Sequence, residues 1–186
     1  AKDSKTIVRI LGLVMARRMT AAAPKVYSLI DSDDAETSLI AKFALADIVG
    51  VQDIDKVGAL LDNASVSDQL ALQNALIAAV HTLAPAERYA KVSALIKKSK
   101  NPVAYYPVLA ATGTDEAVND LAAAYEAGDK SAFTSLLKID NFKVAPVLIK
   151  IAGSDVSLAD KAVKRYSSLV SKYETNIDKK RIDFAK

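Results

Sequence analysis

Apolar residues recur at intervals of three and four along almost the whole chain, while strand-like alternation of apolar and polar residues is rare. This spacing puts apolar side chains on one face of an α-helix, and that face must be buried against another helix. Capping and turn residues interrupt the pattern after roughly every 10 to 17 residues. The sequence therefore predicts an all-α fold of short helices joined by short breaks.

The breaks divide the chain into successive helix-turn-helix units. Ser32, Asp33 and Asp34 are capping candidates for one unit, and Ser67 with Asp68 begins the next. The first helix after Asp34 has a predicted buried stripe formed by Leu39, Ala41, Phe43, Ala44, Ile48 and Val49. Further helices are predicted over residues 53–61, 67–83, 85–96, 103–112, 115–127 (with Gly128 as its C-terminal cap), 130–139, 142–152 and 155–173, and a last one from Asn176 or Asp178.

Helix-turn-helix units recur at a spacing of roughly 34 to 40 residues, which is typical of an α-helical repeat array. A shift of 34 residues aligns Asp34, Ala41 and Ala44 with Asp68, Ala75 and Ala78. Alanine is abundant, and small side chains let paired helices approach closely. We therefore expect residues 1–186 to form one helical-repeat domain, an α-α superhelix (HEAT/ARM-like solenoid) of about five helical pairs. An irregular helical bundle is the alternative.

Residues 67–76 (SDQLALQNAL) and 145–152 (APVLIKIA) resemble HEAT-like helical repeats. The resemblance covers the chain from about Ala35 to Tyr173. More specifically, the chain resembles the repeat region that lies beside jelly-roll domains of the 3-keto-disaccharide hydrolase family in large secreted proteins of gut bacteria. It implies a non-catalytic module or fragment of a longer exported protein (periplasmic or at the cell surface) that handles glycans. The active-site residues of that family belong to a β-sandwich, and no matching positions are present here.

Composition excludes several classes of chemistry. The chain has no cysteine, no tryptophan and one histidine, so disulfides, thiolate nucleophiles, sulfur-ligated zinc and paired-histidine motifs are absent. We expect no cofactor and no catalytic, metal-binding or cofactor-binding residue, and we assign no ligand-binding residue. No apolar stretch approaches the roughly 18 to 20 residues of a membrane span.

Charge is unevenly distributed around a net charge of +3. Residues 1–27 carry six basic groups and one acidic group, whereas residues 28–154 carry 11 basic and 16 acidic groups. Because the acidic centre interrupts any continuous basic face, we do not expect nucleic-acid binding. The basic ends could meet an acidic partner or neighbouring domains of the same chain.

Four groups of polar residues could carry chemistry. His81 with a carboxylate could serve a hydrolase, although His81 lies near a predicted helix end, where histidine is structurally favourable. The acidic run 31–36 begins like a calcium loop but lacks the required glycine and glutamate, so helix capping explains it better. The pairs Asp53/Asp55 and Asp115/Glu116 could in principle serve glycoside hydrolysis, but both lie at predicted helix starts.

Tyr105 and Tyr106 are the candidates for stacking on a glycan, with one of the two expected in the core. We therefore expect a non-catalytic scaffold or protein-interaction module, with an accessory glycan-binding module as the first alternative. The segment 7–15 spreads its apolar residues over more than one helix face. We expect one end of the array to leave an apolar surface that a partner or another part of the protein covers.

Overall fold

A computed structural model describes the backbone of residues 4–184 and the side chains of residues 4–173. Within these residues all regular structure is helical, and no strand is present. The all-α prediction is therefore confirmed. The elements are α1 (Ser4–Ala16), η1 (Thr20–Ala22), α2 (Ala23–Tyr27), α3 (Ala35–Ile48), η2 (Val51–Asp53), α4 (Ile54–Asp62), α5 (Val66–His81), α6 (Pro85–Lys98), η3 (Pro102–Tyr105), α7 (Tyr106–Ala111), α8 (Asp115–Glu126), α9 (Ser131–Leu136), α10 (Val144–Ser154) and α11 (Val156–Phe184).

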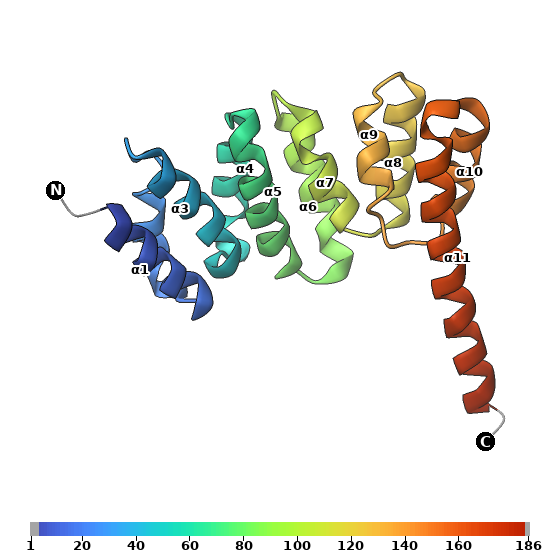
Figure 1. The fold of residues 1–186 in the computed structure, drawn as a ribbon, viewed down its shortest axis with the longest axis horizontal. Helices are drawn as coiled ribbons and strands as arrows, with labels where there is room; N and C mark the ends of the chain where they lie inside the picture. The colour runs from blue at the N-terminus through green and yellow to red at the C-terminus, as the bar shows by residue number, and fades with distance from the viewer. Residues whose placement is uncertain (1–3, 185–186) are drawn as a thin grey trace. The chain divides into compact units, whose positions relative to one another are not determined.

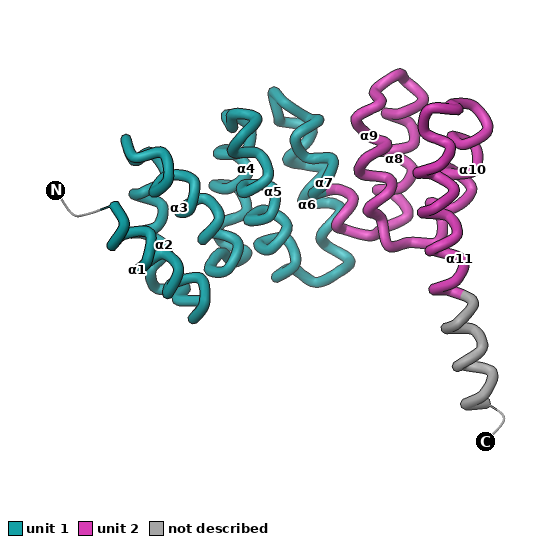
Figure 2. The backbone as a smooth tube through the Cα atoms, viewed as in Figure 1, with its two compact units in different colours: residues 1–108 teal, residues 109–186 magenta. Residues whose placement is uncertain are grey.

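The chain divides into two compact units, Ala1–Val108 and Leu109–Lys186, drawn in teal and magenta in Figure 2. In unit 1, α1 packs on α3 and α3 packs on α5, while α2 covers α3 and α4 covers α5 (Figure 1). In unit 2, α8 packs on α9 and α10 packs on α11.

The contact between α3 and α5 is built largely from small side chains. The face of α3 that is buried consists of Thr37, Ala41, Ala44, Leu45 and Ile48, at the i, i+4, i+7, i+8 spacing of one helix face. On α5 the buried residues are Ala71, Leu72, Ala75, Leu76, Ala79 and Val80. Alanine at the contact allows the two helix backbones to approach closely.

The predicted stripe of α3 is only partly correct. Ala41, Ala44 and Ile48 are buried as predicted, but Leu39 is 36% exposed, and Leu45, which the prediction omitted, is fully buried. Leu39 and Leu45 are six residues apart, which separates them by about 120° around the helix, so Leu39 lies off the face that contains the buried residues. Residue size alone therefore did not decide which side chains are buried.

Gly58 is the point where α4, α6 and η3 come together in unit 1. The Tyr105 hydroxyl donates a hydrogen bond of 2.8 Å to the Gly58 carbonyl oxygen. A Cβ atom at Gly58 would lie 3.3 Å from Leu95 Cδ2, so the absence of a side chain allows this close approach. Tyr105 itself is 1% exposed and is among the largest fully buried side chains.

Gly128 ends α8 in unit 2, as the sequence predicts. Its φ of 101° lies in the left-handed region that glycine adopts without strain. The Gly128 N–H donates to the Tyr125 carbonyl at 3.0 Å, and the Asp129 N–H donates to the Ala124 carbonyl at 3.0 Å. These two bonds form a Schellman motif, which satisfies carbonyls at the helix end.

Two other boundaries differ from the prediction. Residues 17–34 were given no helix, yet η1 and α2 lie there. A break at Asn176 or Asp178 was predicted, but α11 is one continuous helix from Val156 to Phe184. Residues 174–184 contain neither glycine nor proline, and a capping residue type alone does not end a helix.

The Tyr105→Phe substitution tests the contact at Gly58. Removal of the hydroxyl removes a buried hydrogen bond to the Gly58 carbonyl, so we expect the free energy of unfolding to fall by about 1 kcal/mol. Denaturant titration measures this change. Tyr166→Phe, at a half-buried position in α11, is the matched control and should cost less than about 0.5 kcal/mol. Equal stability losses in the two variants would contradict the assignment.

Candidate functional site

His81 is the last residue of α5, and it is exposed. The Arg88 Nη2 donates to the His81 carbonyl oxygen at 2.9 Å, and the Arg88 Nε donates to the Leu83 carbonyl at 3.1 Å. Arg88 thereby links the end of α5 to α6 and supplies a cation at carbonyls that the helix leaves unsatisfied. The three hollows described below are lined by residues other than His81.

The carboxylates of Asp53 and Asp55 are engaged with different partners. Asp53 accepts hydrogen bonds from the Tyr27 hydroxyl at 3.0 Å and from the Gly50 N–H at 2.9 Å, which joins α2 to the turn before α4. Burial, together with the negative charge and hydrogen bond of Asp53, raises the pKa of Tyr27 well above its usual value. Asp55 instead forms an ion pair with Lys91 at 2.7 Å. The two residues are therefore used to hold separate elements together.

The other acidic candidates lie at helix starts. Asp34 accepts the Thr37 N–H at 2.8 Å, and the hydrogen bonds from Thr37 lower the pKa of Asp34. Asp115 accepts from Asn141 Nδ2 at 2.8 Å and pairs with Lys143, and these contacts lower the pKa of Asp115. Capping and cross-linking of helix ends account for both carboxylates.

The described part of the chain has neither a metal-binding cluster nor a membrane-spanning helix. No group of three or more histidine, aspartate or glutamate side chains there could hold a metal ion. No helix there is both long enough and apolar enough to cross a membrane.

The two adjacent tyrosines differ in burial, as the sequence predicts. Tyr105 is the core member, and burial is the main cause that raises the pKa of its hydroxyl. A side chain that is 1% exposed cannot stack on a sugar ring, so Tyr105 is excluded as a glycan contact. Tyr106 is half-buried.

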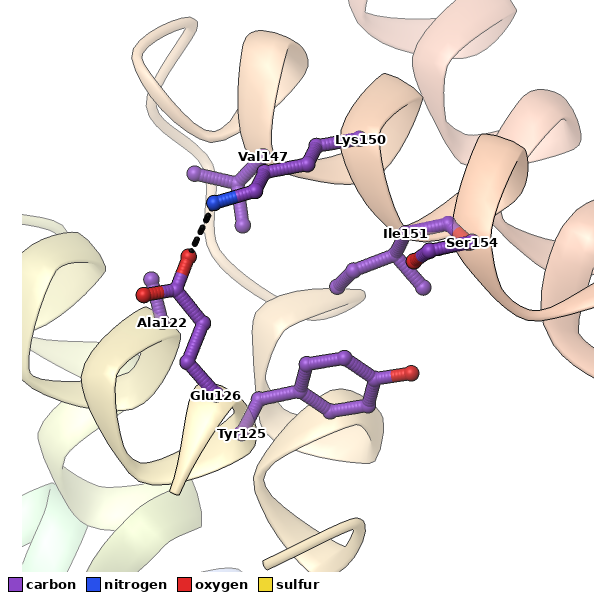
Figure 3. A pocket seen from close by; sticks show the side chains of 7 residues that line it. All are labelled: Ala122, Tyr125, Glu126, Val147, Lys150, Ile151 and Ser154. Carbon is purple, nitrogen blue, oxygen red and sulfur yellow. Dashed lines mark hydrogen bonds and ion pairs between the residues drawn. The ribbon is translucent and has the colours of Figure 1, made fainter. Parts of the chain in front are cut away.

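A small pocket lies in unit 2 between α8 and α10 (Figure 3). The Lys150 Nζ forms an ion pair with a Glu126 carboxylate oxygen across the pocket, at 2.6 Å. The Tyr125 ring, Ile151 and Ser154 also line the pocket. Its volume is about 50 Å³. Typical small-molecule sites measure about 300–1,000 Å³, so this pocket has room for a few water molecules at most.

A polar hollow of about 390 Å³ lies between the starts of α3 and α5. Lys42 is its cation, and the Lys42 Nζ lies 3.0 Å from an Asp68 carboxylate oxygen and 3.0 Å from the Ser38 hydroxyl. Asp68 also accepts a hydrogen bond from Ser65 at 2.8 Å. Lys42 and Asp68 in this hollow are thus already paired with each other.

The third hollow is apolar and lies between α1 and the segment that contains α2. We call it the α1–α2 groove, and its lining residues are Ile7, Ile10, Leu11, Val14, Ala22, Lys25, Val26 and Leu29. Its volume is about 240 Å³, and Lys25 is its only charged lining residue. Ile10, on the rim, is 54% exposed. Of the three hollows, this one offers an unfilled apolar surface.

The two walls of the groove were not equally visible in the sequence. The first wall lies in the segment 7–15, whose apolar residues were predicted to be spread over more than one helix face, so the single face formed by Ile7, Ile10, Leu11 and Val14 was not predicted. The second wall was missed because α2 has only five residues, too few for a periodic signal. The apolar residues Val26 and Leu29 beside Pro24, which can start a helix, were the only local indication.

Comparison of the sequence and structure with protein families, curated proteins and solved structures finds no match. The function of the chain must therefore be argued from its own residues.

Asp155 joins the start of α11 to Lys130 in unit 2. It is the N-cap of α11 and accepts the Ser157 N–H at 3.1 Å. The Lys130 Nζ lies 2.6 Å from its other oxygen. The hydrogen bond from Lys130 is the main cause that lowers the pKa of Asp155 to about 2.

We predict that Asp155→Asn lowers stability at neutral pH and that this loss disappears in acid. The folded state holds the pKa of Asp155 near 2 rather than 3.8, so its contribution is complete above 3.8 and is lost as pH falls through 2. Thermal melts of both proteins across this range measure the difference. Asp160→Asn, at an exposed site on the same helix, is the control and should show no such pH dependence. A loss of equal size at all pH values would contradict the prediction.

Proposed function

We propose that the chain is a non-catalytic helical-repeat scaffold that binds other proteins. The observation that carries this proposal is the succession α1, α3, α5 in unit 1, in which each helix packs on the next, while α2 packs on α3 and α4 packs on α5. Helical-repeat proteins bury their cores in this way, with each unit packed mainly against its neighbours.

The 34-residue spacing supports the repeat interpretation. Shifted by 34 residues, Thr37, Ala41 and Leu45 of α3 meet Ala71, Ala75 and Ala79 of α5, and all six are buried, whereas Ala44 is buried and its counterpart Ala78 is half-buried. A shift of 87 residues also aligns part of the sequence, with Asp68 on Asp155, but it pairs the buried Leu76 with Val163, which is 46% exposed. We therefore base the proposed α-α superhelix of about five helical pairs on the 34-residue spacing.

The partners of the polar candidates favour a structural role over a catalytic one. Asp34, Asp53 and Asp115 each accept hydrogen bonds that fix a helix end or join two elements. Their structural contacts therefore explain why these carboxylates lie where they do, and a catalytic role is not needed to explain it. The resemblance to HEAT-like repeats supports a place for the scaffold within a longer exported glycan-processing protein.

Hydrogen exchange tests the repeat architecture with two matched Val→Ala substitutions in unit 1. Val14 in α1 is 5% exposed and Val92 in α6 is fully buried. Because a repeat array transmits destabilisation mainly between neighbours, we expect Val14→Ala to lower amide protection in α1 and α3 far more than in α6. Val92→Ala should show the reverse pattern. A uniform loss of protection across unit 1 in both variants would indicate one cooperative core and contradict the proposal.

A further inference from the structure

The α1–α2 groove has the geometry of a site for a helix. One wall is formed by Ile7, Ile10, Leu11 and Val14, which follow the i, i+3, i+4, i+7 spacing of a single helix face. Val26 and Leu29 stand on the opposite wall. A partner helix that lays an apolar face into such a groove contributes a row of side chains with the same spacing.

The surface around the groove is strongly basic. Residues 4–27 carry five basic groups and no acidic group, and the basic residues are Lys5, Arg9, Arg17, Arg18 and Lys25. Lys25 lines the groove itself. The Arg17 N–H bonds to the Leu13 carbonyl at 3.1 Å, so Arg17 continues the turn of α1 and lies two turns after Ile10 on the same side.

Four of the five cations beside the groove form no ion pair among the described side chains. Among the ion pairs of the described side chains, none involves Arg9, Arg17, Arg18 or Lys25. Elsewhere in the described chain Lys42, Lys91, Lys130 and Lys143 are all paired with carboxylates. The basic surface beside the groove is therefore available to an acidic partner.

We propose that the α1–α2 groove binds an amphipathic α-helix of a protein partner, with the apolar face of that helix in the groove and acidic residues along its edges. The proposal rests on the scaffold function proposed above and names the site and partner class for it. The apolar contact provides affinity, while the charge complementarity raises the association rate and selects acidic over basic helices.

The concave shape of the groove favours a helix over a membrane surface. A flat bilayer surface can reach protruding side chains such as Ile10 and Leu13, which are 54% and 56% exposed. It cannot fill a concave hollow of about 240 Å³. A row of leucine or isoleucine side chains from a partner helix can enter the hollow and displace water from its walls.

A tryptophan placed in the groove reports binding directly, because the chain has no tryptophan of its own. We use Ile10→Trp as the reporter and Leu13→Trp, equally exposed on the same helix but outside the groove lining, as its matched control. The probe is a synthetic helical peptide of about 18 residues with leucines at i, i+3, i+4, i+7 and glutamates beside them. We expect a saturable blue shift for Ile10→Trp in the micromolar range and little shift for Leu13→Trp.

Two further controls separate groove binding from general attraction. Lys25→Glu in the reporter protein should weaken peptide binding about fivefold or more, whereas Lys98→Glu on α6 should leave it unchanged. A peptide of the same composition with its leucines scattered around the helix should bind far more weakly. Circular dichroism confirms that each variant keeps its helical content.

Three outcomes would overturn the proposal. They are no saturable shift with the acidic amphipathic peptide, equal binding of the scattered peptide, or equal effects of the Lys25 and Lys98 substitutions. Vesicles of phosphatidylcholine with phosphatidylserine are tested in parallel, and binding to them without binding to the peptide would assign the surface to a membrane instead. If the peptide does not bind the groove but the hydrogen-exchange experiment gives the localised pattern predicted above, only the assignment of the binding site is wrong. Uniform loss of protection would instead overturn the repeat scaffold.

Discussion

The close packing of α3 on α5 is the contact on which the architecture of unit 1 depends. Ala41, Ala44, Ala75 and Ala79 are completely buried, so small side chains contribute a large part of the buried faces of the two helices. A larger side chain at any of these positions would force the helices apart, and overpacking of this kind typically costs about 1–3 kcal/mol. Both α1 and α2 pack on α3 as well, so α3 is in contact with three of the helices of unit 1.

Most of the polar residues that could have suggested catalysis have structural partners. Asp53 joins the Tyr27 hydroxyl to the turn before α4, and Asp155 caps α11 while it pairs with Lys130. The α1–α2 groove differs from these features because Ile7, Ile10 and Leu29 keep part of their apolar surface exposed along it, while Lys25 lies outside any ion pair of the described side chains. We therefore place the function of the chain in binding, at a surface where apolar area and uncompensated positive charge coincide.

The helices themselves could be predicted from the sequence because their cores follow the 3.6-residue period, and Gly128 and Asp34 mark their ends as expected. Burial was harder to predict: Leu39 and Leu45 are the same residue type, yet one is 36% exposed and the other is fully buried, because contacts with neighbouring helices decide which face of α3 is covered. The second wall of the groove was missed because α2 is too short to show a period. Long-range contacts such as that of Tyr105 with Gly58 leave no local pattern in the sequence.

Chemical-shift mapping by NMR tests the binding account most directly. Titration of the isotope-labelled protein with an acidic amphipathic helical peptide reports on every methyl group at once. We expect saturable shifts at the methyl groups of Ile7, Ile10, Leu11, Val14 and Leu29, with the methyl groups of Leu121 and Leu148 in unit 2 unchanged. Shifts concentrated away from α1 and α2, or no shifts at peptide concentrations well above the micromolar range, would contradict the account.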